Sequence, residues 1–224
     1  MRRLYKIILI VMICIICTIY IFFLTKEQPL TYLAIGDGVA SGETPYDING
    51  ISFNDYFKEN YHIHSSNKSF SFKNNTVEKI INDINKNMKS DGKYLKQLIY
   101  EADIITIAVG MDELNMYSLT NDVNEEYIKK FCSDYNELLH ILTKLNAKEV
   151  IIIGLYNYFT IKESNIIILN SMLSNLADKY DYKFIDISSF LKEDKYFLDK
   201  DSYYFSYKGH YKIYQMISNT IISK

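Results

Sequence analysis

Continuous apolar runs and segments of helical periodicity alternate along the chain. Four runs of mostly apolar residues suit strands that are buried on both faces of a sheet. They occupy residues 31–36, 103–110, 149–154 and 183–187. A shorter and weaker run at Ser69 to Phe72 predicts a fifth strand.

The segments between these runs carry apolar residues at intervals of three and four, which is the spacing of one buried helix face. One helix is expected to begin near Asn75, and three more are expected at residues 127–145, 162–180 and 206–222. Strands that alternate with helices predict a three-layer α/β/α sandwich with a parallel sheet and right-handed crossovers. Because ligands bind outside the carboxyl ends of such strands, four loops are of interest. These loops begin at Gly36, near Phe72, at Gly110 and at Gly154.

Residues 7–24 form an uncharged run of 18 residues, which is just long enough to cross about 30 Å of hydrocarbon as a helix. Basic residues precede this run, so it is predicted to be a transmembrane signal anchor whose N terminus lies in the cytoplasm. A cleaved signal peptide is the alternative, but its apolar region is usually shorter and ends in small residues. The predicted parts are a cytoplasmic N terminus (1–6), the anchor (7–24), a linker (25–30) and one domain (31–224). The expected location is the cell membrane, with a single pass and an extracellular C-terminal domain.

Composition excludes two classes of protein. The 25 basic and 27 acidic side chains give a formal net charge of −2, which does not fit a basic nucleic-acid binder. Hydrophobic residues make up 48% of the chain, so it is not a disordered polyelectrolyte. Cys132 is the only cysteine beyond the anchor, and the domain must therefore be stabilised by its core rather than by an internal disulfide.

The loop after the first predicted strand reads AIGDGVASG at residues 34–42 and resembles the first block of the SGNH/GDSL hydrolase family. Gly36, Asp37 and Gly42 match that block. The family's nucleophilic serine corresponds to Gly38, which has no side chain that could attack an ester. The resemblance covers residues 31–222, and it implies a flavodoxin-like sheet of the SGNH hydrolase type.

Two further blocks match the family in spacing but not in the residue types that carry out its chemistry. Gly110 to Glu113 resembles the third block, but Asp112 stands where the family has an asparagine that donates to the oxyanion. An ionised Asp112 would repel that charge. The last block resembles Asp201 to Tyr204, in which Asp201 matches the family's aspartate and Tyr204 replaces its general-base histidine. A phenol with an ordinary pKa of about 10 is a poor base at neutral pH.

The remaining block and the candidate replacements do not restore the chemistry. No glycine lies between Ile51 and Asp91, so we expect the backbone donor supplied by the second-block glycine of the family to be lost. Ser41 has no identifiable base, and a lone thiol such as Cys132 in a helical pattern is usually a core residue. His210 belongs to a later Gly-His pair and does not replace the missing histidine.

Carboxylates are the feature that survives these losses. Those predicted to converge on the former active site are Asp37, Asp112, Glu113 and Asp201. The cluster could bind a divalent cation, an amine or a hydroxyl-rich ligand. Alternatively, Asp37 and Glu113 hydrogen-bond loop amides and the other two are solvated. His62 and His64 are spaced like a metal pair, but no third ligand is marked nearby, so neither a metal nor a cofactor is expected.

The sequence therefore predicts a membrane-anchored, extracytoplasmic SGNH/GDSL hydrolase-like protein that has lost catalysis. In this interpretation Asp37, Gly38, Asp112, Glu113, Asp201 and Tyr204 form a binding site or scaffold for an envelope polysaccharide or a protein partner. The alternative is an active esterase or deacetylase that acts on acylated envelope polysaccharide or lipid through a non-standard nucleophile. The membrane is the expected partner of the N-terminal helix, and no nucleic-acid partner is expected.

Overall fold

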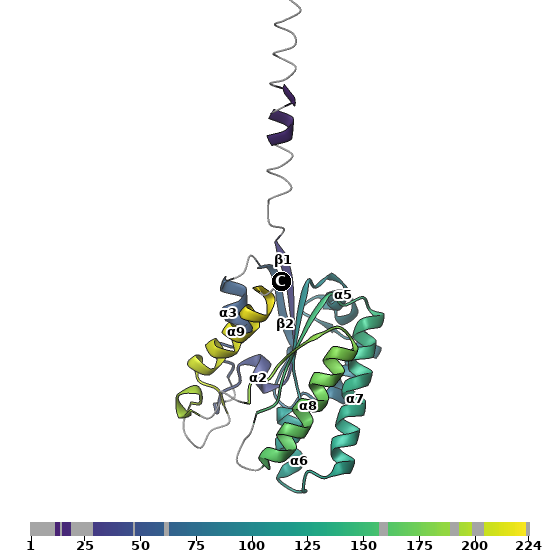
Figure 1. Ribbon diagram of the computed structural model, residues 1–224, viewed down its shortest axis with the longest axis vertical. Helices are drawn as coiled ribbons and strands as arrows, with labels where there is room; N and C mark the ends of the chain where they lie inside the picture. The colour runs from purple at the N-terminus through teal and green to yellow at the C-terminus, as the bar shows by residue number, and fades with distance from the viewer. Residues whose placement is uncertain are drawn as a thin grey trace, which may run out of the picture.

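The computed structural model describes residues 12–13, 15–18, 29–46, 48–60, 63–156, 161–188, 193–198 and 204–222 (Figure 1). Its centre is a five-stranded parallel sheet in the order β2-β1-β5-β6-β7. The strands are β1 (Leu30–Gly36), β2 (Ile63–Ser71), β5 (Ile104–Ala108), β6 (Glu149–Ile153) and β7 (Lys183–Ile185). A small antiparallel hairpin joins β3 (Lys89–Ser90) to β4 (Lys93–Tyr94).

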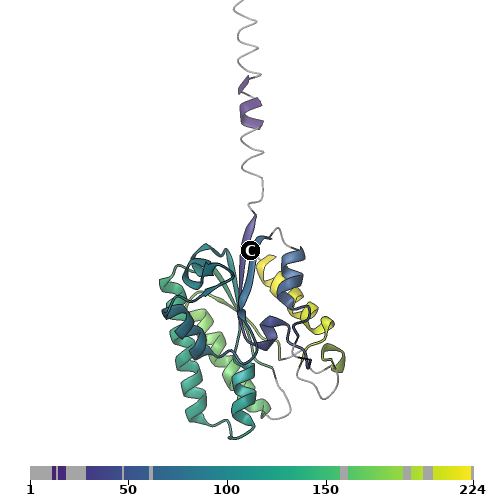
Figure 2. The same ribbon diagram turned by 180° about the vertical axis from the view of Figure 1, so that it is seen from behind.

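Helices cover both faces of the sheet and make the three layers that Figures 1 and 2 show from opposite sides. One layer contains α3 (Phe53–Asn60) and α9 (Tyr207–Ile222), which pack against each other. The opposite layer contains α4 (Val77–Asn85), α5 (Leu95–Glu101), α7 (Glu125–Lys144) and α8 (Glu163–Lys179). Shorter elements are α2 (Gly38–Ser41), α6 (Met111–Ser118) and the 3₁₀ helix η1 (Asp194–Tyr196).

The central strands explain why the sheet is parallel and covered on both faces. Every residue of β5 is buried, and so are four of the five residues of β6. Tyr32 of β1 pairs with Ile104 of β5, and Ile104 pairs in turn with Glu149 of β6. Strands that are apolar on both faces lose favourable burial unless helices cover both sides. The predicted three-layer sandwich with a parallel, flavodoxin-like strand order is therefore confirmed.

Several elements differ from the sequence prediction, among them β2, α3 and α5. The weak strand predicted at 69–72 is the end of β2, which begins six residues earlier, at Ile63. Its upstream half is polar and half-exposed at the sheet edge, so it lacks an apolar run. The helices α3 and α5 were not predicted, because each is shorter than nine residues and only three residues of each are buried.

The predicted anchor at 7–24 lies largely outside the described residues, which include only 12–13 and 15–18 of that run. No helix among the residues that the structure describes has both the length and the apolar character needed to span a bilayer.

Candidate functional site

The turn after β1 and the turn after β5 meet at Asp37. Its Oδ1 accepts the Val39 N–H at 3.0 Å and so caps α2, while its Oδ2 accepts the N–H groups of Gly110 and Met111 at 3.0 and 2.9 Å. Asp37 is fully buried. Burial and the neighbouring Asp112 carboxyl raise the pKa of Asp37, although its backbone donors oppose that shift. Asp37 thus links the turn after β1 to the turn after β5 through backbone N–H groups.

Two backbone N–H groups converge on one carboxylate oxygen of Asp112. Oδ2 of this buried side chain accepts the N–H of Gly38 at 3.0 Å and the N–H of Asn74 at 2.8 Å. Hydrolases of acyl groups place backbone donors at such distances from the oxygen that becomes negative in the transition state. In this chain the oxygen at which the two donors converge belongs to the Asp112 carboxylate. Burial raises the pKa of Asp112, while the two N–H donors and the charge of Lys73 lower it.

Asn74 corrects the prediction that the second-block donor is lost. This residue has φ +57°, the left-handed conformation that glycine adopts without cost and that asparagine tolerates best among other residues. In that conformation its N–H points at Asp112. Although no glycine lies between Ile51 and Asp91, a backbone N–H donor is therefore still present in this segment, at Asn74. An asparagine just before the predicted helix was the signal that sequence reasoning missed.

Glu43 was also missed, and it lies against Gly38, the position to which the sequence resemblance assigns the nucleophile. A Cβ built on Gly38 would overlap Oε2 of Glu43 and would lie 3.1 Å from Oδ2 of Asp112. Glu43 is buried, and its Oε1 forms an ion pair with Lys73 Nζ at 2.7 Å. Burial raises the pKa of Glu43, while Lys73 opposes the shift. A glycine at position 38 is what makes room for this carboxyl group.

Tyr204 completes the same site. Its hydroxyl donates to Oε1 of Glu43 at 3.4 Å. Together with Gly38 and Asp112 it lines a cavity of about 10 Å³, which has room for roughly one water molecule. The structure therefore brings Gly38, Asp112 and Tyr204 together, and side chains of the chain itself fill most of the space between them.

His210 lines this cavity as well. It is buried, and burial lowers its pKa to about 4, so the imidazole is neutral at pH 7. Its Nδ1 has no hydrogen-bond partner among the described residues. The closest aromatic neighbour is Phe205, whose ring centroid lies 5.5 Å away in an edge-to-face arrangement. No serine lines the cavity within the described part of the chain, so this imidazole faces no nucleophile there.

The other candidate residues lie elsewhere. Glu113 accepts the Val77 N–H at 2.9 Å at the start of α4. This is the hydrogen bond to a loop amide that the sequence analysis gave as the alternative to ligand binding. Burial raises the pKa of Glu113 to about 7. Asp201 and His62 lie outside the described residues. Cys132 packs against Met172, and burial raises the pKa of its thiol to about 11. No group of three or more metal-ligating side chains occurs among the residues described.

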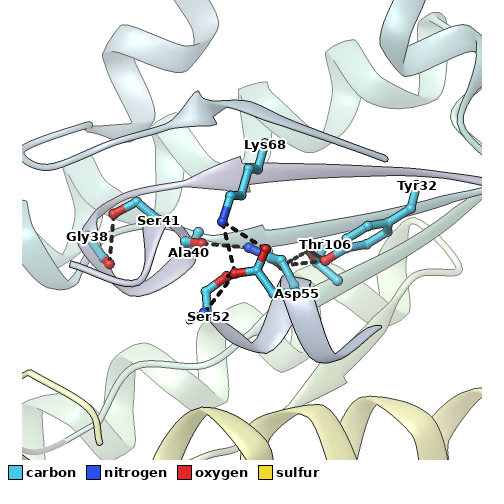
Figure 3. A network of polar contacts seen from close by, with 9 residues as sticks. Tyr32, Gly38, Ala40, Ser41, Ser52, Asp55, Lys68 and Thr106 are labelled. Carbon is cyan, nitrogen blue, oxygen red and sulfur yellow. Dashed lines mark hydrogen bonds and ion pairs between the residues drawn. The ribbon is translucent and has the colours of Figure 1, made fainter. Parts of the chain in front are cut away.

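A buried polar network holds the α2 turn against the sheet (Figure 3). The hydroxyl of Tyr32 bonds to Asn54 and to Thr106, the latter at 2.6 Å. Asn54 in turn donates to the carbonyl of Ala40 at 2.6 Å, so that α3 is tied to α2. Ser41 is directed back onto its own turn, since its Oγ donates to the Gly38 carbonyl at 3.0 Å (Figure 3). Ser41 is therefore engaged with the backbone rather than directed at the cavity.

Comparison with known proteins identifies the fold. No protein-family model matches the chain, and no curated protein matches it. A catalytic mutant of Axe2, an acetylxylan esterase from Geobacillus stearothermophilus, matches with a TM-score of 0.63 and 14% identity, covering 86% of this chain and 94% of that chain. A lipolytic protein of the G-D-S-L family from Desulfitobacterium hafniense DCB-2 matches with a TM-score of 0.64 and 15% identity, covering 85% of this chain and 98% of that chain. Phospholipase A1 from Streptomyces albidoflavus NA297 matches with a TM-score of 0.54 and 11% identity, covering 72% of this chain and 80% of that chain.

These likenesses place the chain in a structural class, that of three-layer α/β/α proteins with a parallel sheet. More particularly, the chain has the SGNH/GDSL hydrolase-like fold, as the resemblance of its sequence blocks predicted. At identities of 10–16% the likeness establishes the fold alone.

Replacing Asn54 should destabilise the protein through the buried network. Asn54→Leu keeps the approximate volume but leaves the Tyr32 hydroxyl and the Ala40 carbonyl without this partner. We expect a loss of about 1–3 kcal/mol in the free energy of unfolding, measured by urea denaturation. Asn60→Leu on the same helix is the control, because Asn60 is exposed and bonds only to its own helix at Tyr56. Equal effects of the two changes would contradict the importance of the network.

Gly38→Ser should be destabilising because of Glu43 rather than because of the turn. The new Cβ would overlap the buried Glu43 carboxyl, so we expect a cost of about 1–3 kcal/mol, and Glu43→Ala in the same chain should recover at least about 1 kcal/mol. Gly50→Ser is the control, since a Cβ there meets its nearest neighbour at an ordinary 3.4 Å. A double-mutant cycle of unfolding free energies that shows strict additivity would refute the steric role of Glu43.

Glu113 should make stability depend on pH. Its pKa is about 7 in the folded state, against 4.5 as the ordinary value, so the folded state binds the extra proton between these values. The free energy of unfolding is therefore expected to fall as the pH rises from about 4.5 to 7. Glu113→Gln keeps an oxygen for the Val77 N–H and removes the titration, so it should be more stabilising at pH 8 than at pH 5, by about 1–3 kcal/mol. Parallel pH profiles for both proteins would show that Glu113 does not titrate in this range.

Proposed function

We propose that this protein is a catalytically inactive SGNH/GDSL hydrolase-like protein, held at the outer face of the cell membrane, that acts by binding or scaffolding at the cell envelope. The observation that carries the proposal is the position of Asp112. Its Oδ2 accepts the backbone N–H groups of Gly38 and Asn74, the two donors that an acyl oxyanion would need. An oxyanion could enter only by displacing a buried carboxylate, which would then lose both hydrogen bonds next to a second negative charge.

The nucleophile and the base support the same conclusion. Gly38 supplies no attacking atom, and the Glu43 carboxyl fills the space where a serine side chain would begin. Tyr204 hydrogen-bonds to that carboxyl. Residues that act as one catalytic unit contribute little when their partners are gone, so single remnants do not sustain turnover.

Membrane tethering rests on the apolar run at 7–24 and on the basic residues before it. Six residues separate this run from Thr31, so the domain would lie close to the bilayer. The strand β1 begins at Leu30 and ends at Gly36, so the filled crevice lies ~20 Å farther along the strand direction. The crevice would thus face away from the membrane, toward the envelope.

An active esterase or deacetylase remains the second candidate, and Glu43 is the group that would support it. Its Oε2 has no partner among the described residues and borders the cavity of about 10 Å³. As a general base it would take a proton from a water molecule, whose oxygen would attack the acyl carbonyl and release the alcohol or amine. This route still requires Asp112 to leave the two backbone donors.

An activity assay on the full-length chain in detergent separates the two candidates. We expect no hydrolysis of p-nitrophenyl acetate above the buffer rate and no labelling by a fluorophosphonate probe. Hydrolysis that disappears in Glu43→Gln would establish the esterase, and serine labelling would reveal a nucleophile that the described residues do not contain at the crevice.

The matched positive control restores the family's groups in the same chain. It combines Gly38→Ser, Asp112→Asn and Tyr204→His with Glu43→Ala, which removes the overlap at position 38. We expect this variant to gain measurable ester hydrolysis, because the N–H groups of Gly38 and Asn74 are already aimed at one point. A folded but wholly inactive variant would count against the alignment of the crevice with a hydrolase site.

A further inference from the structure

A second concave surface lies between α3, η1 and the outer face of α9. It has a volume of about 450 Å³, within the range of small-ligand sites. We call it the tyrosine–lysine groove, after Tyr56, Tyr196, Tyr207, Lys208, Tyr211 and Lys212. The groove is separate from the crevice, since His210 and Ile213 of α9 are buried on the inner side of the helix while Tyr207 and Tyr211 are exposed.

Aromatic rings make up much of the groove. Tyr207 is 63% exposed and Tyr211 is 44% exposed, so both rings offer surface to a ligand. Tyr56 meets Tyr211 edge-to-face, with ring centroids 5.2 Å apart, so these two rings form one contiguous aromatic surface. Contiguous exposed aromatic surface in a concave site marks a binding surface.

The charge of the groove has one sign. Lys208 and Lys212 lie one turn apart on α9, and no carboxylate lines the groove among the residues that the structure describes. The carboxylates around the groove are Glu59 and Asp55, which add to the effect of burial in raising the pKa of Tyr56, and Glu193, which is paired with Lys195 beside Tyr196. Like charges at this spacing repel each other along a helix. Lys208 is also the second residue of α9, where the helix dipole disfavours a cation.

Lys208 thus weakens α9 locally, and a bound anion would remove that penalty. Sequence choices that conflict with local helix stability are expected at functional sites. Tyrosines suit protein interfaces as well, but lysines are depleted from the cores of such interfaces, which favours an anionic ligand over a protein. The flat tyrosine rings suit the C–H faces of sugar rings.

The position of the groove separates a glycan from a lipid headgroup. The C-terminal end of α9 lies beside the beginning of β1 (Figure 1), and Lys183 at the start of β7 donates to the Thr220 carbonyl at 2.8 Å. The N-terminal half of α9, which carries the groove, is therefore at the end of the domain away from Leu30. Given the proposed membrane tether, on which this step rests, the groove faces the envelope rather than the bilayer.

We propose that the tyrosine–lysine groove binds a segment of an anionic glycan. Sugar rings stack on Tyr207 and Tyr211, and the carboxylate or phosphate groups of the chain pair with Lys208 and Lys212. Gln215, which also lines the groove, offers an amide to the sugar hydroxyls.

Calorimetric titration of the full-length chain in detergent with an oligogalacturonate tests this proposal. We expect binding that weakens as salt is added, and binding at least about tenfold weaker for the fully methyl-esterified oligomer, which has the same rings without the charges. The double variant Lys208→Ala with Lys212→Ala should weaken binding at least about fivefold, and Tyr211→Ala at least about threefold, while Tyr211→Phe retains it. All of these side chains are on the surface, and thermal unfolding verifies that each variant is folded.

Lys144→Ala on α7 and Tyr100→Ala on α5 are the controls, because both are exposed residues of the opposite helix layer. Equal affinity for the esterified oligomer, or equal losses in the control variants, would overturn the proposal. Binding to phosphatidylglycerol vesicles with no binding to the oligogalacturonate would assign the groove to a membrane instead. The proposed function is tested separately by the esterase assay, so an active enzyme that binds glycan at the groove would refute the first proposal and leave the second standing.

Discussion

One carboxylate oxygen of Asp112 joins three segments that are far apart in the sequence. It accepts the backbone N–H of Gly38 at the start of α2 and that of Asn74 in the turn after β2, while Asp112 itself belongs to α6. Backbone N–H groups that are buried without an acceptor are costly. In an enzyme, water or substrate satisfies such donors, whereas here the protein satisfies them permanently. In the function that we propose, this favourable structural contact is also what would close the oxyanion site.

The hydrogen bonds that hold the loops around the crevice do not depend on catalytic side chains. Asp37 ties α2 to the turn after β5 through backbone donors, and Asn54 ties α2 to α3 and to the sheet. Neither contact requires a serine at position 38 or a histidine at position 204. Conversely, Glu43 can fill the crevice only because residue 38 has no Cβ. Gly38, Asp112 and the buried Glu43 are thus physically linked, and they make one packed site rather than three independent features.

The sequence predicted the fold well because the signals that define it are strong. Buried strands such as β5 and β6 are continuous apolar runs, and α7 and α8 are long enough to show helical periodicity. The crevice was only partly predictable. Gly38 could be located from its motif, but the φ of Asn74 and the inward rotation of Glu43 arise from tertiary contacts that leave no periodic pattern. The half-polar start of β2 was missed for the same reason.

The distribution of charge explains how the filled crevice is compatible with the ligand binding that we propose for the tyrosine–lysine groove. Carboxylates of Asp37, Glu43 and Asp112 are buried at the crevice, and only Lys73 forms an ion pair there among the described residues. Burial raises the pKa of all three carboxyl groups, so the crevice already disfavours negative charge and would poorly accommodate a further anion. On the outer side of α9, the lysines present the opposite sign beside exposed rings. A negatively charged polymer would therefore be directed to the groove and away from the crevice. The proposed binding along α9 needs no opening of the Asp112 contact, so the packing of the crevice would impose no cost on recognition at the outer face.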